Sequence, residues 1–153
     1  MRFYLFMFMF FVLLFSCVVS DQSGVNTNTP TKIAKFSDCF VQKGPFVQGS
    51  SVVIQELNDS FEPTGKLFNT ETKDDFGSFS MNVELSTNYI EIISNGYYFN
   101  EVSGQLPGPL TLRVMTDLTA DSSVNVNLLT TLSKDRIKYL ITSNNKTFKE
   151  AKT

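Results

Sequence analysis

The sequence predicts a mainly β protein: an antiparallel β-sandwich, preceded by an N-terminal signal helix and followed by a C-terminal α-helix. Three observations support this prediction. Between residues 36 and 118 apolar and polar residues alternate, as they do in strands that bury one face. Stretches rich in Gly, Pro, Asn and Asp separate these segments, and no helical pattern intervenes. From residue 128 onward the apolar residues recur with a helical period.

The chain begins with an apolar run from Phe3 to Phe15 that follows one charged residue, Arg2. As a helix this run rises about 20 Å, which is short of the roughly 30 Å hydrocarbon core of a bilayer. A charged start and an apolar centre of this length are typical of an export signal peptide. With the residues up to Val19 the run approaches the length of a membrane span, so a retained anchor is the alternative.

The run ends in Leu14-Phe15-Ser16-Cys17, which resembles the lipobox of bacterial lipoproteins. Phe15 is bulkier than the residue usual at its position. The resemblance implies that residues 1–16 are removed and that the Cys17 thiolate is lipidated, since a thiolate is the nucleophile that takes up the lipid. The protein is then expected in the bacterial cell envelope, at the outer membrane. The alternative is an ordinary signal cut after Ser20 and a secreted protein.

Residues 17–35 are expected to form a flexible tether between the anchor and the fold. Residues 18–32 are rich in Ser, Thr, Asn, Gly and Pro and lack the apolar period of a helix or strand. The tether is short, so the folded domain is expected close to the membrane surface.

The sandwich is predicted over residues 36–120. The stretch SFSMNVELS gives the clearest alternation, with the odd-numbered residues of 79–85 on one apolar face. Two later stretches, 89–99 and 110–118, alternate in the same way. Cys39 lies in a strand-like stretch and is expected to be a small buried hydrophobic residue. The residues predicted to face the core are Val52, Ile54, Phe79, Met81, Val83, Leu85, Ile90, Ile92, Leu110, Leu112 and Val114.

The stretch KDDFGSF, residues 73–79, predicts a tight turn that leads directly into a strand. Asp74 or Asp75 can accept backbone N–H bonds at the start of the turn, and Gly77 can supply a positive φ. The spacing of the acidic residues does not match an EF-hand calcium loop, so a structural turn is predicted and no metal site.

Two motifs in this region resemble the carboxypeptidase-regulatory-like, transthyretin-type β-sandwich. The first is TKDDFGSFSM, residues 72–81, and the second is YIEIISNGY, residues 89–97. The resemblance extends over about residues 40–150 to a group of bacterial envelope lipoproteins of unassigned function. It implies a transthyretin-like or immunoglobulin-like sandwich that serves as a non-catalytic accessory or scaffold module. The matching positions are Thr72, Asp74, Asp75, Gly77, Phe79, Tyr89, Gly96 and Tyr97.

Residues 121–153 are predicted to be helical. A helix is expected over 124–143 with one broad apolar side, capped by Asn125 or Asn127 and ended by the asparagines that follow. Thr147 and Glu150 then have the spacing of a capping box, which predicts a second helix. This tail is interpreted as the truncated start of a second domain; the alternative is a frayed terminus.

Composition restricts the function. The chain has no histidine, which excludes histidine-based zinc sites and Ser-His-Asp or Cys-His catalysis. Its net charge is −2 without a basic patch, so no nucleic-acid partner is expected. No cofactor motif is found. Carboxylates occur as scattered residues, with Glu84 and Glu91 at positions expected to face solvent, so the protein is not expected to be an enzyme. The carboxylates considered are Glu84, Glu91, Asp74, Asp75 and Asp117.

The sequence therefore predicts a lipid-anchored cell-envelope binding or scaffold protein. Its partners are the membrane, through the lipid anchor, and an envelope protein or a glycan. The aromatic cluster at Tyr97 and Tyr98 is the nearest candidate for stacking on a sugar, although alternation points these two rings to opposite faces. The alternative is a truncated accessory domain of a secreted or surface hydrolase, which includes glycan binding.

Overall fold

The computed structural model describes residues 30–119 and 123–153. The predicted signal helix, the lipobox and Cys17 lie outside these residues. Within them the chain forms seven strands followed by two helices. The elements are β1 (Lys32–Gln42), β2 (Ser51–Leu57), β3 (Pro63–Glu71), β4 (Ser78–Leu85), β5 (Tyr89–Gly96), β6 (Leu110–Asp117), β7 (Asn125–Asn127), α1 (Leu128–Asn144) and α2 (Phe148–Lys152).

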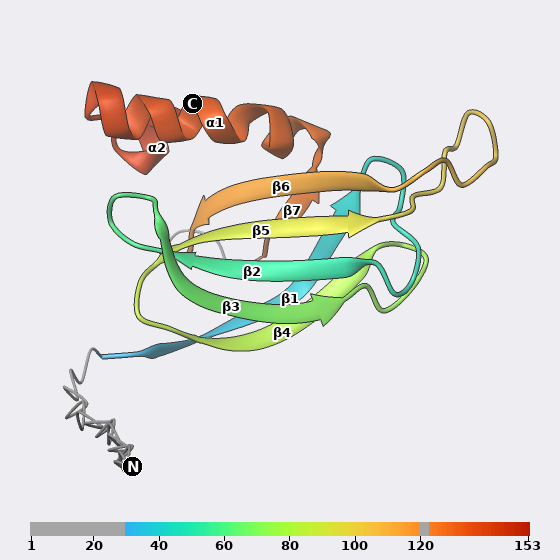
Figure 1. Ribbon diagram of the computed structural model, residues 1–153, viewed down its shortest axis with the longest axis horizontal. Helices are drawn as coiled ribbons and strands as arrows, with labels where there is room; N and C mark the ends of the chain where they lie inside the picture. Colours follow the sequence, from blue (N-terminus) through green and yellow to red (C-terminus); the bar gives the residue numbers. More distant parts are fainter. Residues whose placement is uncertain (1–29, 120–122) are drawn as a thin grey trace, which may run out of the picture.

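The strands form two sheets that lie one behind the other (Figure 1). One is antiparallel with the order β3-β2-β5-β6, and the other has the order β4-β1-β7. The inward side chains of both sheets form one core. The predicted mainly β fold with a C-terminal helix is therefore confirmed. Of the residues predicted to face the core, Met81 and Leu110 are partly buried and the others are buried.

Strand β1 starts inside the segment that was predicted to be a tether. Lys32 pairs with Leu85, and the pairing with β4 continues from there. Residues 32–35 are mostly exposed, so they lack the apolar alternation by which a strand is recognised in a sequence. The strand forms because β4 offers a hydrogen-bonding edge along its whole length, which composition does not reveal.

A β-bulge in β1 explains its irregular apolar spacing. Phe36 pairs with Met81 and Cys39 with Phe79, so two residues of β1 lie opposite one residue of β4. Asp38, within the bulge, has a positive φ of 55°. The extra residue lets both Phe36 and Cys39 point into the core, although they are three positions apart.

Strand β7 corrects two expectations. Residues 125–127 pair with Phe40–Gln42 of β1 in a parallel direction, so the strands are not all antiparallel. The helix was expected from residue 124, capped by Asn125 or Asn127; it starts at Leu128, and its N-cap is Asn127, the second of the two predicted caps. Val124 and Val126 are buried in the core between the sheets. This burial and the pairing with β1 override the helical period of the local sequence.

A second apolar cluster lies between the outer face of the four-stranded sheet and the helices. Its buried members include Met115 of β6, Ile137 of α1 and Ala151 of α2. Phe61, in the turn after β2, packs against Tyr89 with ring centroids 4.6 Å apart, and Phe148 of α2 stacks on both rings at 6.3 Å. The capping box at Thr147 and Glu150 is present as predicted. The C-terminal tail is thus packed on the sheet and is not frayed.

Helix α1 lies along β6, the edge strand of this sheet (Figure 1). Thr131 Oγ1 accepts a hydrogen bond from the Arg113 N–H at 2.8 Å, and Thr130 Oγ1 donates to the Arg113 carbonyl at 2.9 Å. Beneath the helix, Glu91 forms ion pairs with Arg113 at 3.0 Å and Lys134 at 3.4 Å. The expectation that Glu91 faces solvent is therefore wrong, because α1 covers that part of the sheet.

Only part of the broad apolar side predicted for α1 is covered. Ile137 is buried, whereas Leu128, Leu129 and Leu132 in the first two turns are exposed. The contacts of this first part of the helix with β6 are made by its threonines. The exposed leucines therefore point away from the sheet.

Candidate functional site

Three connections and the start of α1 meet at one end of the two sheets, which we call the loop end. The connections are residues 43–50, 72–77 and 97–109, and residues 127–129 lie beside them. Strand β1 runs from Lys32 to this end, so the described chain starts at the opposite end (Figure 1). Loops at the end of a rigid pair of sheets are a common place for recognition.

Backbone contacts hold the first and third connections together. The Phe99 N–H donates to the Pro45 carbonyl at 2.8 Å, and the Val47 N–H donates to the Tyr97 carbonyl at 3.0 Å. A Cβ atom at Gly44 would lie 1.9 Å from the Phe99 carbonyl oxygen, so only glycine fits there. The two segments are therefore fixed relative to each other by main-chain atoms.

The predicted turn residues hold the second connection. Asp74 accepts hydrogen bonds from the Phe76 and Ser78 N–H groups at 3.0 Å and from the Ser78 hydroxyl at 2.6 Å. The Asp75 Oδ1 atom accepts from the Gln48 N–H at 2.9 Å, which joins this turn to residues 43–50. Gly77 has a φ of 75°, the conformation for which glycine was predicted.

The hydrogen bonds from Ser78 and Phe76 lower the pKa of the Asp74 carboxyl. A carboxyl whose folded pKa lies below its unfolded value stabilises the fold above the unfolded pKa, and this stabilisation is lost as the pH falls through the folded pKa. We expect Asp74→Ala to be less stable than the unmodified protein at pH 7, and the difference to shrink below the ordinary carboxyl pKa of 3.8. Urea unfolding followed by circular dichroism over a pH series tests this; a difference independent of pH would contradict it.

The two tyrosines proposed for sugar stacking differ in their surroundings. The Tyr98 ring packs on Phe46 with centroids 6.2 Å apart, and the Lys43 ammonium lies 4.7 Å from its centre. The ring is thus partly buried. Tyr97 points the other way and is 50% exposed. The structure therefore leaves Tyr97, and not the pair, available for stacking.

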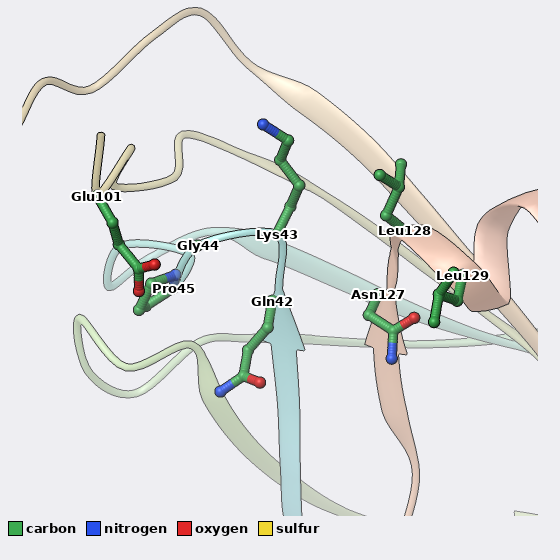
Figure 2. A pocket seen from close by; sticks show the side chains of 8 residues that line it. All are labelled: Gln42, Lys43, Gly44, Pro45, Glu101, Asn127, Leu128 and Leu129. Carbon is green, nitrogen blue, oxygen red and sulfur yellow. The ribbon is translucent and has the colours of Figure 1, made fainter. Parts of the chain in front are cut away.

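Two hollows open at the loop end among the described residues, and Pro45 lines both. The Leu128 hollow has a volume of about 470 Å³ (Figure 2). Figure 2 shows the Glu101 side chain directed towards Pro45, and Leu128 and Leu129 on the opposite side at the start of α1. Its lining residues are Gln42, Lys43, Gly44, Pro45, Glu101, Asn127, Leu128 and Leu129.

The second hollow, the Phe76 hollow, is larger and more apolar, with a volume of about 640 Å³. Phe76 is 71% exposed, and Phe99 and Leu106 are also exposed. Sequence reasoning missed this site because period-two alternation identifies buried faces and not exposed apolar ones. An aromatic residue inside a polar turn was the available signal. The lining residues are Pro45, Val47, Asp75, Phe76, Phe99, Gly104 and Leu106.

The carboxylates considered as catalytic candidates are not brought together. Glu84 lies at an exposed position of β4 and Glu91 on the outer face of the other sheet. Asp74 and Asp75 lie in the loop-end turn, whereas Asp117 ends β6 at the opposite end. Among the described residues, no three His, Cys, Asp or Glu side chains are grouped as metal ligands.

Cys39 is buried, as predicted. Burial raises the pKa of its thiol, and the sulfur accepts a hydrogen bond from the Val124 N–H at 3.4 Å. A thiol in this state is a poor nucleophile, because the thiolate is the reactive form.

No helix in the described part of the chain is long and apolar enough to span a bilayer. No protein-family model matches the chain, and neither a curated protein nor a solved structure matches it.

Proposed function

We propose that this chain is a non-catalytic binding or scaffold protein that lipid on Cys17 holds at the outer membrane of a bacterial cell envelope. One observation carries the binding role: exposed large apolar side chains gather at the loop end. Soluble domains rarely expose such a group of apolar residues unless it meets a partner. The residues are Phe76, Tyr97, Phe99, Val102, Leu106, Leu128 and Leu129.

The position of the anchor supports the same function. The segment from Cys17 to Lys32 spans at most about 50 Å when fully extended. It joins the fold at the start of β1, opposite the loop end. An anchor at Cys17 therefore keeps the domain within reach of the membrane, and because the tether joins at the opposite end it leaves the loop end free to meet a partner in the envelope.

We also propose that the fold is the carboxypeptidase-regulatory-like, transthyretin-type sandwich. The motif residues of this chain together stabilise the connections at the loop end, which supports the proposal. Thr72 is buried, accepts a hydrogen bond from the Ser50 N–H at 2.9 Å and donates to the Val47 carbonyl at 2.6 Å. Asp74 and Gly77 form the turn that follows, and Phe79 enters the core. The motif therefore fixes the loop end rather than supplying a reactive group.

A role as an enzyme is less well supported than binding. Paired carboxylates act on glycosides only when they flank the same bond. Glu84 and Glu91 lie on outward positions of different sheets, and the two ion pairs of Glu91 join it to Arg113 and Lys134. The sugar-stacking alternative depends on Tyr97 alone, because Tyr98 is packed on Phe46.

Lipidation is tested by expressing the full chain with its leader in a bacterium and determining the mass of the protein from the membrane fraction. We expect a mature chain that begins at Cys17 and carries acyl chains, since about 0.8 kcal/mol per buried methylene makes acylation an effective anchor. Cys17→Ser is expected to lose the acyl mass and leave the washed membranes. Cys39→Ala is the matched control and is expected to remain lipidated.

Two results would contradict the anchor. One is an unmodified chain that begins at Asp21, which would indicate an ordinary secreted protein. The other is a protein that retains residues 1–16, which would indicate a leader that is not cleaved.

A further inference from the structure

We infer that the Phe76 hollow binds a peptide segment of a protein partner in which a large apolar side chain lies beside a lysine or arginine. The inference rests on the proposed binding function and specifies the chemistry of the partner. The shape, the charge and the rigidity of the hollow support it.

The hollow has the size and lining of a site for apolar side chains. Its volume of about 640 Å³ lies within the range of roughly 300–1,000 Å³ typical of ligand sites. Phe76 and Phe99 contribute aromatic rings, and Leu106 adds an aliphatic wall. Rings exposed in this way lose unfavourable contact with water when another apolar group covers them.

The negative charge near the hollow favours a basic residue in the peptide, next to the apolar side chain that enters the hollow. Asp75 is the one charged residue that lines the hollow, and Glu101 lines the neighbouring Leu128 hollow, which shares Pro45 with it. Among the described residues, neither carboxylate forms an ion pair with a lysine or arginine. Lys43 and Lys73 lie on the same connections and keep their charge, but their ammonium groups contact the hydroxyls of Tyr98 and Ser80 and neither pairs with Asp75 or Glu101.

The same charges argue against other occupants. A carboxylate beside an apolar hollow repels phosphate groups, so an anionic lipid surface is disfavoured. It attracts the guanidinium or ammonium group of a peptide and steers its approach. A basic residue next to the inserted apolar side chain therefore satisfies both features of the site.

The site is already formed before a partner binds. Residues 43–50 and 97–109 are joined by the hydrogen bond from Phe99 to Pro45, and Asp75 is fixed by the Gln48 N–H. Gly44 packs directly on the backbone of Phe99. Because main-chain atoms hold these connections together, their backbone loses little conformational entropy when a peptide is bound.

The experiment uses the full mature protein in detergent and a phage-displayed library of random twelve-residue peptides. We expect the selected sequences to share Phe, Tyr, Trp or Leu next to Lys or Arg. A synthetic copy of the consensus peptide is then titrated by fluorescence anisotropy. Replacing its apolar residue by Ala, or its basic residue by Glu, is expected to weaken binding by about tenfold or more.

Three variants assign the binding to the hollow. Phe76→Ser removes an exposed ring and is expected to weaken binding of the consensus peptide about tenfold. Asp75→Asn keeps an oxygen that can accept from Gln48 but removes the charge, so binding should weaken several-fold and lose much of its salt dependence. Leu67→Ser is the matched control, because Leu67 is 53% exposed on β3, away from the hollow, and its loss should leave binding unchanged.

Several outcomes would overturn the inference. They are a selected consensus that is acidic or lacks an apolar residue, equal binding by Phe76→Ser and the unmodified protein, or a library that yields no binder. If isolated envelope glycan or a second copy of the chain binds the loop end instead, the partner class named here is wrong and the proposed binding function stands. Failure of the lipid-anchor proposal would be detected separately, by a mass of the mature protein that shows no acyl chains on Cys17.

Discussion

Replacing Gly77 with alanine is expected to lower the free energy of unfolding by about 3 kcal/mol or more. Gly77 has a φ of 75°, which a residue with a side chain adopts at a cost. A Cβ atom there would lie 2.3 Å from the Val41 carbonyl oxygen and 3.1 Å from the Phe46 nitrogen. Both are backbone atoms, so no side-chain rotation relieves the clash. Urea unfolding followed by circular dichroism measures the loss.

Gly104→Ala is the matched control for this prediction. Gly104 also has a positive φ, 65°, but nothing lies within 4 Å of the place its Cβ would take. Its substitution therefore carries the conformational cost alone, about 1 kcal/mol. An equal loss of stability in both variants would show that the contact with Val41 is not what requires glycine at position 77.

Removing the Glu56 side chain is expected to destabilise the protein by about 3 kcal/mol, because it leaves several polar groups without their acceptor. Glu56 is only 1% exposed. Its carboxylate accepts hydrogen bonds from the Thr64 hydroxyl at 2.9 Å and from the N–H groups of Ser86 and Thr87, and Lys66 lies 3.8 Å away. The residue thereby joins β3 to the turn in which the chain passes from one sheet to the other.

Glu71→Ala is the control for Glu56→Ala, since Glu71 is an exposed residue at the end of β3. We expect its effect to remain within about 0.5 kcal/mol. Glu56→Gln keeps one acceptor oxygen and should fall between the two. The free energy of unfolding from urea titrations separates the three variants. A loss in Glu56→Ala no larger than that in Glu71→Ala would mean that water replaces the carboxylate without cost.

The two predictions also bear on binding. The Gly77 turn carries Asp75 and Phe76, so a shift of its backbone moves two walls of the Phe76 hollow. We therefore expect Gly77→Ala to weaken peptide binding even under conditions in which the variant stays folded. Glu56 lies at the opposite end, beside the turn at Ser86, so Glu56→Ala should reduce stability and leave the affinity of the folded protein unchanged.

Alternation alone could predict most of the strands. In β4 the residues Phe79, Val83 and Leu85 are buried as predicted, because a strand with one face in the core must alternate. The turn at Asp74 and Gly77 was also predictable, since its chemistry is local. The capping box at Thr147 and Glu150 is local in the same sense, and it is present in the structure.

Other features depended on contacts between distant segments. In the sequence, Glu56 is one polar residue on an otherwise apolar strand face, and the pattern gives no sign of its partners. These partners come from β3 and from the turn after β4. Glu91 was expected to face solvent and is covered by α1. Val126 continues an apolar period that suits a helix, yet pairing with β1 makes it part of a strand.

The sequence by itself determined most of the strands, which face of each of these is apolar, and where glycine and aspartate are needed in the turn at residues 74–77. These properties depend on residues only a few positions apart, whose conformations are set by the same short stretch of backbone. Only the tertiary structure decided the parallel pairing of β7 with β1, the burial of Glu56 and the assembly of the Phe76 hollow. The hollow gathers side chains from three connections that are far apart in the chain, and such proximity is created by the packing of the two sheets.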